Sequence, residues 1–132
     1  MKVVVVITDP SVVEMTRAAL RPLGGVVQGC EGVCAAGRAI LREGTDLILL
    51  DLDLPGLTGE AALRLLREVA PRVPVLVLAS EPSPATTVGL LMAGARRVVA
   101  KPLDLQQLRA IVYAETSTIS GKVGEGVVSC AV

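Results

Sequence analysis

The 132-residue sequence contains no histidine, tryptophan or phenylalanine, and Tyr113 is its only aromatic residue. Without histidine a zinc site would lack its usual nitrogen ligand, and the three cysteines, Cys30, Cys34 and Cys130, form no CxxC pair. We therefore predict that these thiols are buried side chains rather than metal ligands or redox groups. Hydrophobic residues make up 52% of the chain, so the core must consist of aliphatic side chains.

The chain also lacks a net charge and a long apolar run. Thirteen basic and thirteen acidic residues cancel, so no overall attraction to nucleic acid or to an anionic membrane is expected. The first apolar run stops at Thr8-Asp9-Pro10, which makes it too short for a membrane-spanning helix or for the core of a signal peptide. These absences predict a cytoplasmic protein of one domain that contacts neither nucleic acid nor a membrane.

Short apolar segments alternate with segments of helical spacing. "KVVVVIT" is rich in β-branched residues, which favours a strand buried on both faces. The next segment has apolar residues at helical spacing, begins near Pro10 and ends before Gly24. The pattern recurs, and the predicted pairs of strand and helix are residues 2–8 and 11–23, 26–30 and 32–44, 46–51 and 59–70, 73–79 and 84–94, and 96–100 and 103–114.

Five such units predict an α/β fold, a flavodoxin-like (βα)5 doubly wound parallel sheet with strand order 2-1-3-4-5. Its functional crevice is expected outside the carboxyl ends of the first and third strands. Carboxylates gathered there repel one another unless a cation compensates them, so we expect the Lys101 nitrogen within about 6 Å of the Asp51 carboxylate. The residues at the carboxyl ends of the strands are Thr8, Asp9, Asp51, Asp53, Ala79, Ser80 and Lys101.

These features together resemble the receiver domain of two-component response regulators. An acid follows the first strand, "LLDLDLPGLTG" ends the third, and "AKPLD" follows the fifth. The resemblance covers residues 1–114 and leaves 115–132 as a carboxyl-terminal tail or linker. It implies that Asp51 accepts a phosphoryl group from a histidine kinase, that Asp53 lends a backbone carbonyl to Mg²⁺, and that Lys101 contacts the phosphoryl oxygens.

The chain departs from the family pattern at three places. Receiver domains usually carry two adjacent acids after the first strand, where this chain has Ile7 and Thr8, with Asp9 one residue late. The metal set Asp9, Asp51 and Asp53 is therefore expected to bind Mg²⁺ weakly or not at all. At the two switch positions, Ala79 replaces the usual Thr or Ser, with Ser80 displaced by one residue, and Val98 replaces a frequent aromatic residue.

Each candidate residue also has a structural interpretation. Asp9 is well placed to cap the following helix, and Lys101 to neutralise Asp51 as a structural ion pair. Ser80 fits either the turn or the cap of the helix that begins near Pro84. Asp51 and Asp53 themselves fit the simple end of a strand.

Three functional hypotheses follow. The first is an atypical receiver that signals through protein contacts with weak or absent phosphorylation of Asp51; the second is a conventional receiver phosphorylated there by a histidine kinase with Mg²⁺. The third, a flavodoxin-type module for a small ligand, is disfavoured by the near absence of aromatic residues. No enzyme activity is expected beyond self-phosphorylation of Asp51 from a phosphodonor.

Partners are expected on one face of the predicted domain. The resemblance implies a sensor histidine kinase or another signalling protein as partner, and possible homodimerisation through the fourth helix, fifth strand and fifth helix. Arg96, Arg97 and Arg109 are the predicted anchors, since arginine is enriched where interfaces carry binding energy. In the tail, Val127, Val128 and Val132 are expected to pack on the domain or on a neighbouring subunit.

Overall fold

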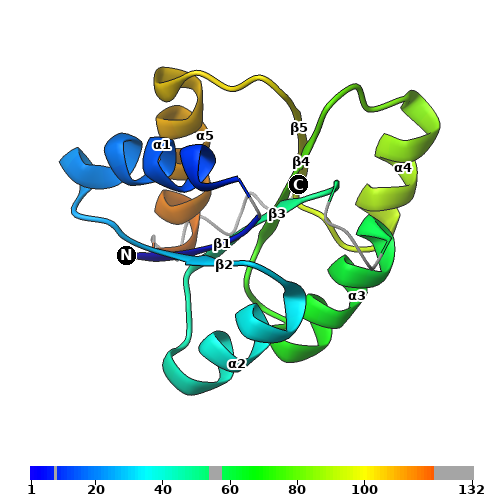
Figure 1. The fold of residues 1–132 in the computed structure, drawn as a ribbon, viewed down its shortest axis with the longest axis horizontal. Coiled ribbons are helices and arrows are strands. Elements are labelled where there is room, and N and C mark those ends of the chain that lie inside the picture. Colours follow the sequence, from blue (N-terminus) through cyan, green and yellow to red (C-terminus); the bar gives the residue numbers. More distant parts are fainter. Residues whose placement is uncertain (8, 54–57, 121–132) are drawn as a thin grey trace.

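The computed structural model describes residues 1–7, 9–53 and 58–120. Over these residues, parallel strands alternate with helices, and the strands form one sheet in the order β2-β1-β3-β4-β5 (Figure 1). The predicted fold is confirmed. The strands are β1 (Lys2–Val6), β2 (Val26–Cys30), β3 (Leu47–Asp51), β4 (Val75–Ala79) and β5 (Arg97–Ala100), and the helices are α1 (Pro10–Leu20), the 3₁₀ turn η1 (Arg21–Leu23), α2 (Val33–Glu43), α3 (Gly59–Val69), α4 (Pro84–Met92) and α5 (Leu105–Ser120).

The core is aliphatic and is divided by the sheet into two layers. Successive side chains of a strand point to opposite faces, so Val4 and Val6 face one layer while Val3 and Val5 face the other. α1 and α5 cover one face, and α2, α3 and α4 cover the other (Figure 1). Every residue of β3 and β4 is buried, which explains why both strands are continuous apolar runs rather than alternating ones.

Two expectations about individual segments are wrong. Cys30 is buried, and burial raises the pKa of its thiol, but Cys34 is exposed because it lies at the solvent side of the first turn of α2. The last helix was predicted to end at residue 114, yet α5 continues to Ser120. Cys130 and the valines at 127, 128 and 132 lie outside the described residues, and the division into 1–114 and 115–132 stays a prediction.

No helix in the described part of the chain is both long enough and apolar enough to cross a membrane.

Candidate functional site

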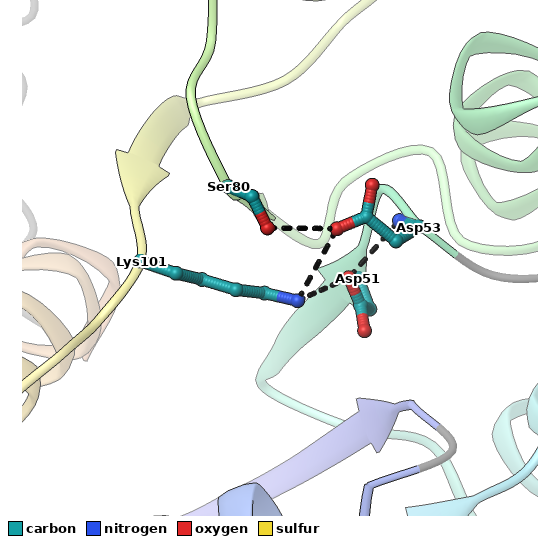
Figure 2. A network of polar contacts seen from close by, with 4 residues as sticks. All are labelled: Asp51, Asp53, Ser80 and Lys101. Atoms are coloured by element: carbon teal, nitrogen blue, oxygen red, sulfur yellow. Dashed lines mark hydrogen bonds and ion pairs between the residues drawn. The ribbon is translucent and has the colours of Figure 1, made fainter.

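Asp51 is the last residue of β3 and only 6% of its surface is exposed. Its Oδ1 atom accepts a hydrogen bond from Lys101 Nζ at 2.8 Å and another from the backbone N–H of Asp53 at 3.0 Å (Figure 2). The predicted proximity of Lys101 and Asp51 is therefore confirmed, well inside the expected limit. The two residues are 50 positions apart in the chain and meet because the carboxyl ends of parallel strands share one edge of the sheet.

Backbone hydrogen bonds continue the pairing with β4 one residue beyond the ends of β3 and β5, into the loops that hold these side chains. The N–H of Leu52 donates to Leu78 O at 2.9 Å, just beyond β3. The N–H of Lys101 donates to Ala79 O at 2.8 Å, just beyond β5. Lys101 and the loop containing Asp53 are thus both tied to β4, which lies between them in the sheet order.

Asp53 lies at the outer side of the site, with 55% of its side chain exposed. Its Oδ2 atom accepts a hydrogen bond from Ser80 Oγ at 3.1 Å and is 3.5 Å from Lys101 Nζ (Figure 2). The sequence placed Ser80 at the correct edge but did not predict this bond. The signal available was the position of Ser80 directly after the fully buried strand β4, at the carboxyl edge of the sheet where Asp53 also lies.

Lys101 bridges the two carboxylates, and its pKa reflects the balance of burial and charge. Its partial burial alone would lower the pKa of the ammonium group. The hydrogen bond that the ammonium donates to Asp51 and the negative charges of Asp51 and Asp53 outweigh this effect and raise the pKa of Lys101 above its ordinary value. The ammonium therefore stays charged at neutral pH and offsets the negative charge of the buried Asp51.

Asp9 has the structural role that its position allowed. It is the N-cap of α1: its Oδ1 atom accepts hydrogen bonds from Ser11 N–H at 3.0 Å and from Ser11 Oγ at 2.8 Å. These two bonds lower the pKa of Asp9. The capping prediction is confirmed, and it accounts for an acid placed one residue late.

The described residues do not fit the three-acid Mg²⁺ site that the family pattern implies. Among residues 1–7, 9–53 and 58–120, no three side chains of His, Cys, Asp or Glu are grouped so that they could hold a metal ion. Asp9 lines a groove with Lys101 and Leu103, but its carboxylate bonds to its own helix. Thr8 lies outside the described residues, so the predicted facing of its side chain toward the site is untested.

Comparison with known proteins settles the family. The family model for the response regulator receiver domain matches residues 3–113. The chain belongs to this family. It therefore acts as a receiver domain in two-component signal transduction, a class of domain that in general uses Mg²⁺ at its phosphorylation site, works with sensor kinases and is not itself an enzyme.

Individual relatives agree with this assignment of the receiver domain. The chain is 37% identical over 106 residues to response regulator protein PmrA of Pseudomonas aeruginosa. The aligned region covers 80% of this chain and 48% of PmrA. It thus spans about half of that relative's length. Two solved structures share its fold. A two-component response regulator from Clostridium difficile has a TM-score of 0.84 at 21% identity, over 92% of this chain and 99% of that chain. The beryllofluoride-activated NtrC4 receiver domain dimer has a TM-score of 0.82 at 22% identity, over 90% of this chain and 98% of that chain.

The two predicted switch positions carry small aliphatic side chains, of which Ala79 is buried and Val98 is partly buried. Ala79 ends β4 and is 1% exposed. Val98 is partly buried and packs against the core layer that lies under α2 and α3. Neither side chain carries a hydroxyl or a ring, so a hydroxyl near Asp51 and Asp53 must come from elsewhere, and among the described residues Ser80 supplies one.

The three predicted partner arginines do not form one cluster. Arg97 Nε lies 2.7 Å from Glu115 Oε2, and Arg96 Nε lies 3.3 Å from Glu115 Oε1. The side chain of Glu115 is only 7% exposed, whereas both arginines are about half exposed. Arg109 instead donates from Nε to Ala19 O in α1 at 2.9 Å, which places its guanidinium at the packing of α5 on α1. Their predicted role as partner anchors is not tested by these contacts.

Gly59, eight residues after Asp51, packs closely against Leu52 beside the site. A Cβ atom at this position would overlap Leu52 Cδ1 and would lie 3.0 Å from Leu52 Cγ. Leu52 lies between Asp51 and Asp53, is partly buried and packs against the core, so its side chain would have to leave this packing to admit the added atom. Alanine at the first residue of α3 therefore requires Leu52 to repack.

We expect Gly59→Ala to lower the free energy of unfolding by about 1–2 kcal/mol, because the overlap with Leu52 outweighs the gain in helix propensity. Urea unfolding measures this change. The control is Gly37→Ala inside α2, where a Cβ atom would meet only Val69 Cγ2 at 3.9 Å and a gain of about 0.5–1 kcal/mol is expected. A stabilising effect at both positions would show that Leu52 does not restrict position 59.

Proposed function

We propose that this chain is an atypical receiver domain, in which phosphorylation of Asp51 is weak or absent and the output passes through protein–protein contacts. The observation that carries the proposal is the use of Asp9 as a helix cap, away from any group of three acids in the described residues. Mg²⁺ requires near-octahedral oxygen ligands and is bound by few protein groups, so the loss of one carboxylate sharply weakens such a site.

The ion pair at the site supports the same proposal. Lys101 and the amide of Asp53 already compensate the charge of Asp51, so the site holds its buried carboxylate without a metal ion. A buried acid that is paired and hydrogen-bonded in this way serves the stability of the domain whether or not it accepts a phosphoryl group.

A conventional phosphorylated receiver is the second candidate, and one observation favours it. Among the described residues, both bonds to the carboxylate of Asp51 go to Oδ1. The second oxygen, Oδ2, receives none from the described part of the chain and is the atom available to attack a phosphoryl donor. No observation on the described residues favours a flavodoxin-type ligand module.

The partner surface that fits this proposal lies on α4 and β5. Val88, Leu91 and Met92 of α4 expose 54%, 44% and 83% of their surfaces, so much of this short apolar helix is uncovered. Arg96 and Arg97 lie next to it in the chain, each with about half of its side chain exposed. An apolar patch beside half-exposed arginines suits a sensor kinase, another signalling protein or a second copy of the chain.

We expect weak binding of Mg²⁺ by the unmodified protein and tighter binding by Thr8→Asp, by about tenfold or more, because the substitution adds a carboxylate at the family position. Titration followed by the amide resonances of Asp51 and Asp53 measures both constants. Asp9→Ala is the control, and it is expected to leave Mg²⁺ affinity nearly unchanged since Asp9 bonds to Ser11.

The same samples test phosphorylation. With beryllofluoride and Mg²⁺, or with acetyl phosphate, we expect no stable adduct on Asp51 by mass spectrometry and no change of oligomeric state by light scattering. A stable adduct that alters dimerisation through α4 and β5, together with tight Mg²⁺ binding, would establish the conventional receiver instead.

A further inference from the structure

Ser80 is the first residue after β4, and its hydroxyl connects two loops of the site. Its Oγ donates to Asp53 Oδ2 at 3.1 Å, joining the segment after β4 to the segment after β3 (Figure 2). These residues are 27 positions apart in the chain. The preceding residue, Ala79, has no hydroxyl with which to make such a contact.

Asp53 in turn shares Lys101 with Asp51. Lys101 Nζ lies 2.8 Å from Asp51 Oδ1 and 3.5 Å from Asp53 Oδ2, so the ammonium is held more closely by Asp51 (Figure 2). An anionic group added to Asp51 would draw the ammonium further toward it, whereas a cation bound by Asp53 would repel it. Either change alters the attraction between the Lys101 ammonium and the Asp53 carboxylate, to which Ser80 donates its hydrogen bond.

On its other side, Ser80 is joined to α4 by a short and stiff segment. Only Glu81, Pro82 and Ser83 separate it from Pro84, the first residue of α4, and the two prolines restrict the backbone between them. Ser83 caps the helix by accepting a hydrogen bond from Thr86 N–H at 3.1 Å. Asp53, Ser80, Ser83 and Thr86 line one pocket, so the two loops and the first turn of α4 are neighbours.

We infer that Ser80 is a positioning residue that couples the charge of the Asp51–Lys101–Asp53 site to the start of α4. The coupling runs through the Ser80–Asp53 hydrogen bond. Ser80 follows Ala79, which occupies the position where the family usually has a hydroxyl. It goes beyond the proposed function because it requires no phosphoryl group on Asp51. Any group that changes the charge of the site, including a divalent cation, would act through it.

The test uses the charge of Asp53 as the signal and the amide resonances of residues 83–88 as the readout, with no phosphodonor present. Asp53→Asn is expected to shift these resonances in the wild-type background. In the Ser80→Ala background the same substitution is expected to shift them much less, because only the direct effect of the lost charge remains and the bond that carries the coupling is absent. Ser80→Thr, which keeps a hydroxyl, is expected to restore the shift.

Ser11→Ala is the matched control, since Ser11 also donates its hydroxyl to an exposed carboxylate, that of Asp9. In this background the effect of Asp53→Asn on residues 83–88 is expected to equal that in the wild type. Equal shifts in the wild-type and Ser80→Ala backgrounds would overturn the inference, as would the absence of any shift in the wild type. An adduct on Asp51 would contradict the proposed function but would leave this result unchanged.

Discussion

Lys101→Met is expected to lower the free energy of unfolding by about 3 kcal/mol at pH 7, because it leaves the buried Asp51 carboxylate without its counter-charge. Methionine keeps most of the length of the side chain, so the loss is mainly electrostatic. The remaining bond from the amide of Asp53 satisfies Oδ1 but supplies no full positive charge. Urea unfolding at neutral pH gives the value.

The control is the double variant Asp51→Asn with Lys101→Met, which removes both charges. Replacement of both partners of a buried pair is often nearly neutral, so we expect its stability within about 1 kcal/mol of the wild type. If the single Lys101→Met variant were as stable as the wild type, the Asp51 carboxylate would not depend on Lys101. The ion pair would then contribute no stability to the domain.

The pH dependence of this pair follows from the raised pKa of Lys101. A group whose pKa is raised on folding contributes its stability fully below the pKa of the unfolded chain, here 10.5, and loses it as the pH rises through the higher folded value. The difference in stability between the wild type and Lys101→Met should therefore be constant from pH 7 to about pH 9 and should decline only in stronger alkali.

A chain that ends at Ala114 is expected to be less stable than one that ends at Ser120 by about 2 kcal/mol, because it lacks Glu115. Glu115 is almost fully buried and binds Arg96 and Arg97, which connects α5 to the start of β5. Both arginines are half exposed and regain water when the acid is absent, which limits the cost. Urea unfolding of the two chains under identical conditions measures it.

The matched variant is Glu115→Ala in the chain that ends at Ser120, which keeps the length of the helix and is expected to reproduce most of the loss. Equal stability of the two truncated chains would support 114 as the end of the folded unit. A loss in the shorter chain would place Glu115 inside that unit and move the boundary beyond the predicted one.

The sequence was sufficient to predict the parallel sheet and part of the candidate site. Burial on both faces requires runs such as "LILLD" and "VLVLA", and the alternation of such runs with helical spacing leaves few arrangements other than a parallel sheet. Because the carboxyl ends of these strands meet at one edge, the proximity of Asp51 and Lys101 also followed from the sequence. The cap formed by Asp9 is a local feature, and local features are the ones that sequence describes best.

Only the tertiary structure decided which side chains touch within that edge and on the surface. The bond from Ser80 to Asp53 depends on the directions in which two loops leave the sheet, and the exclusion of a side chain at Gly59 depends on where Leu52 packs. In the same way, burial of Glu115 follows from the path of α5, which brings Glu115 to Arg96 and Arg97 at the start of β5 while Arg109 contacts α1. The sequence determined the elements and the shared edge through periodicity, whereas these contacts arise from the packing of segments distant in the chain, which periodicity does not encode.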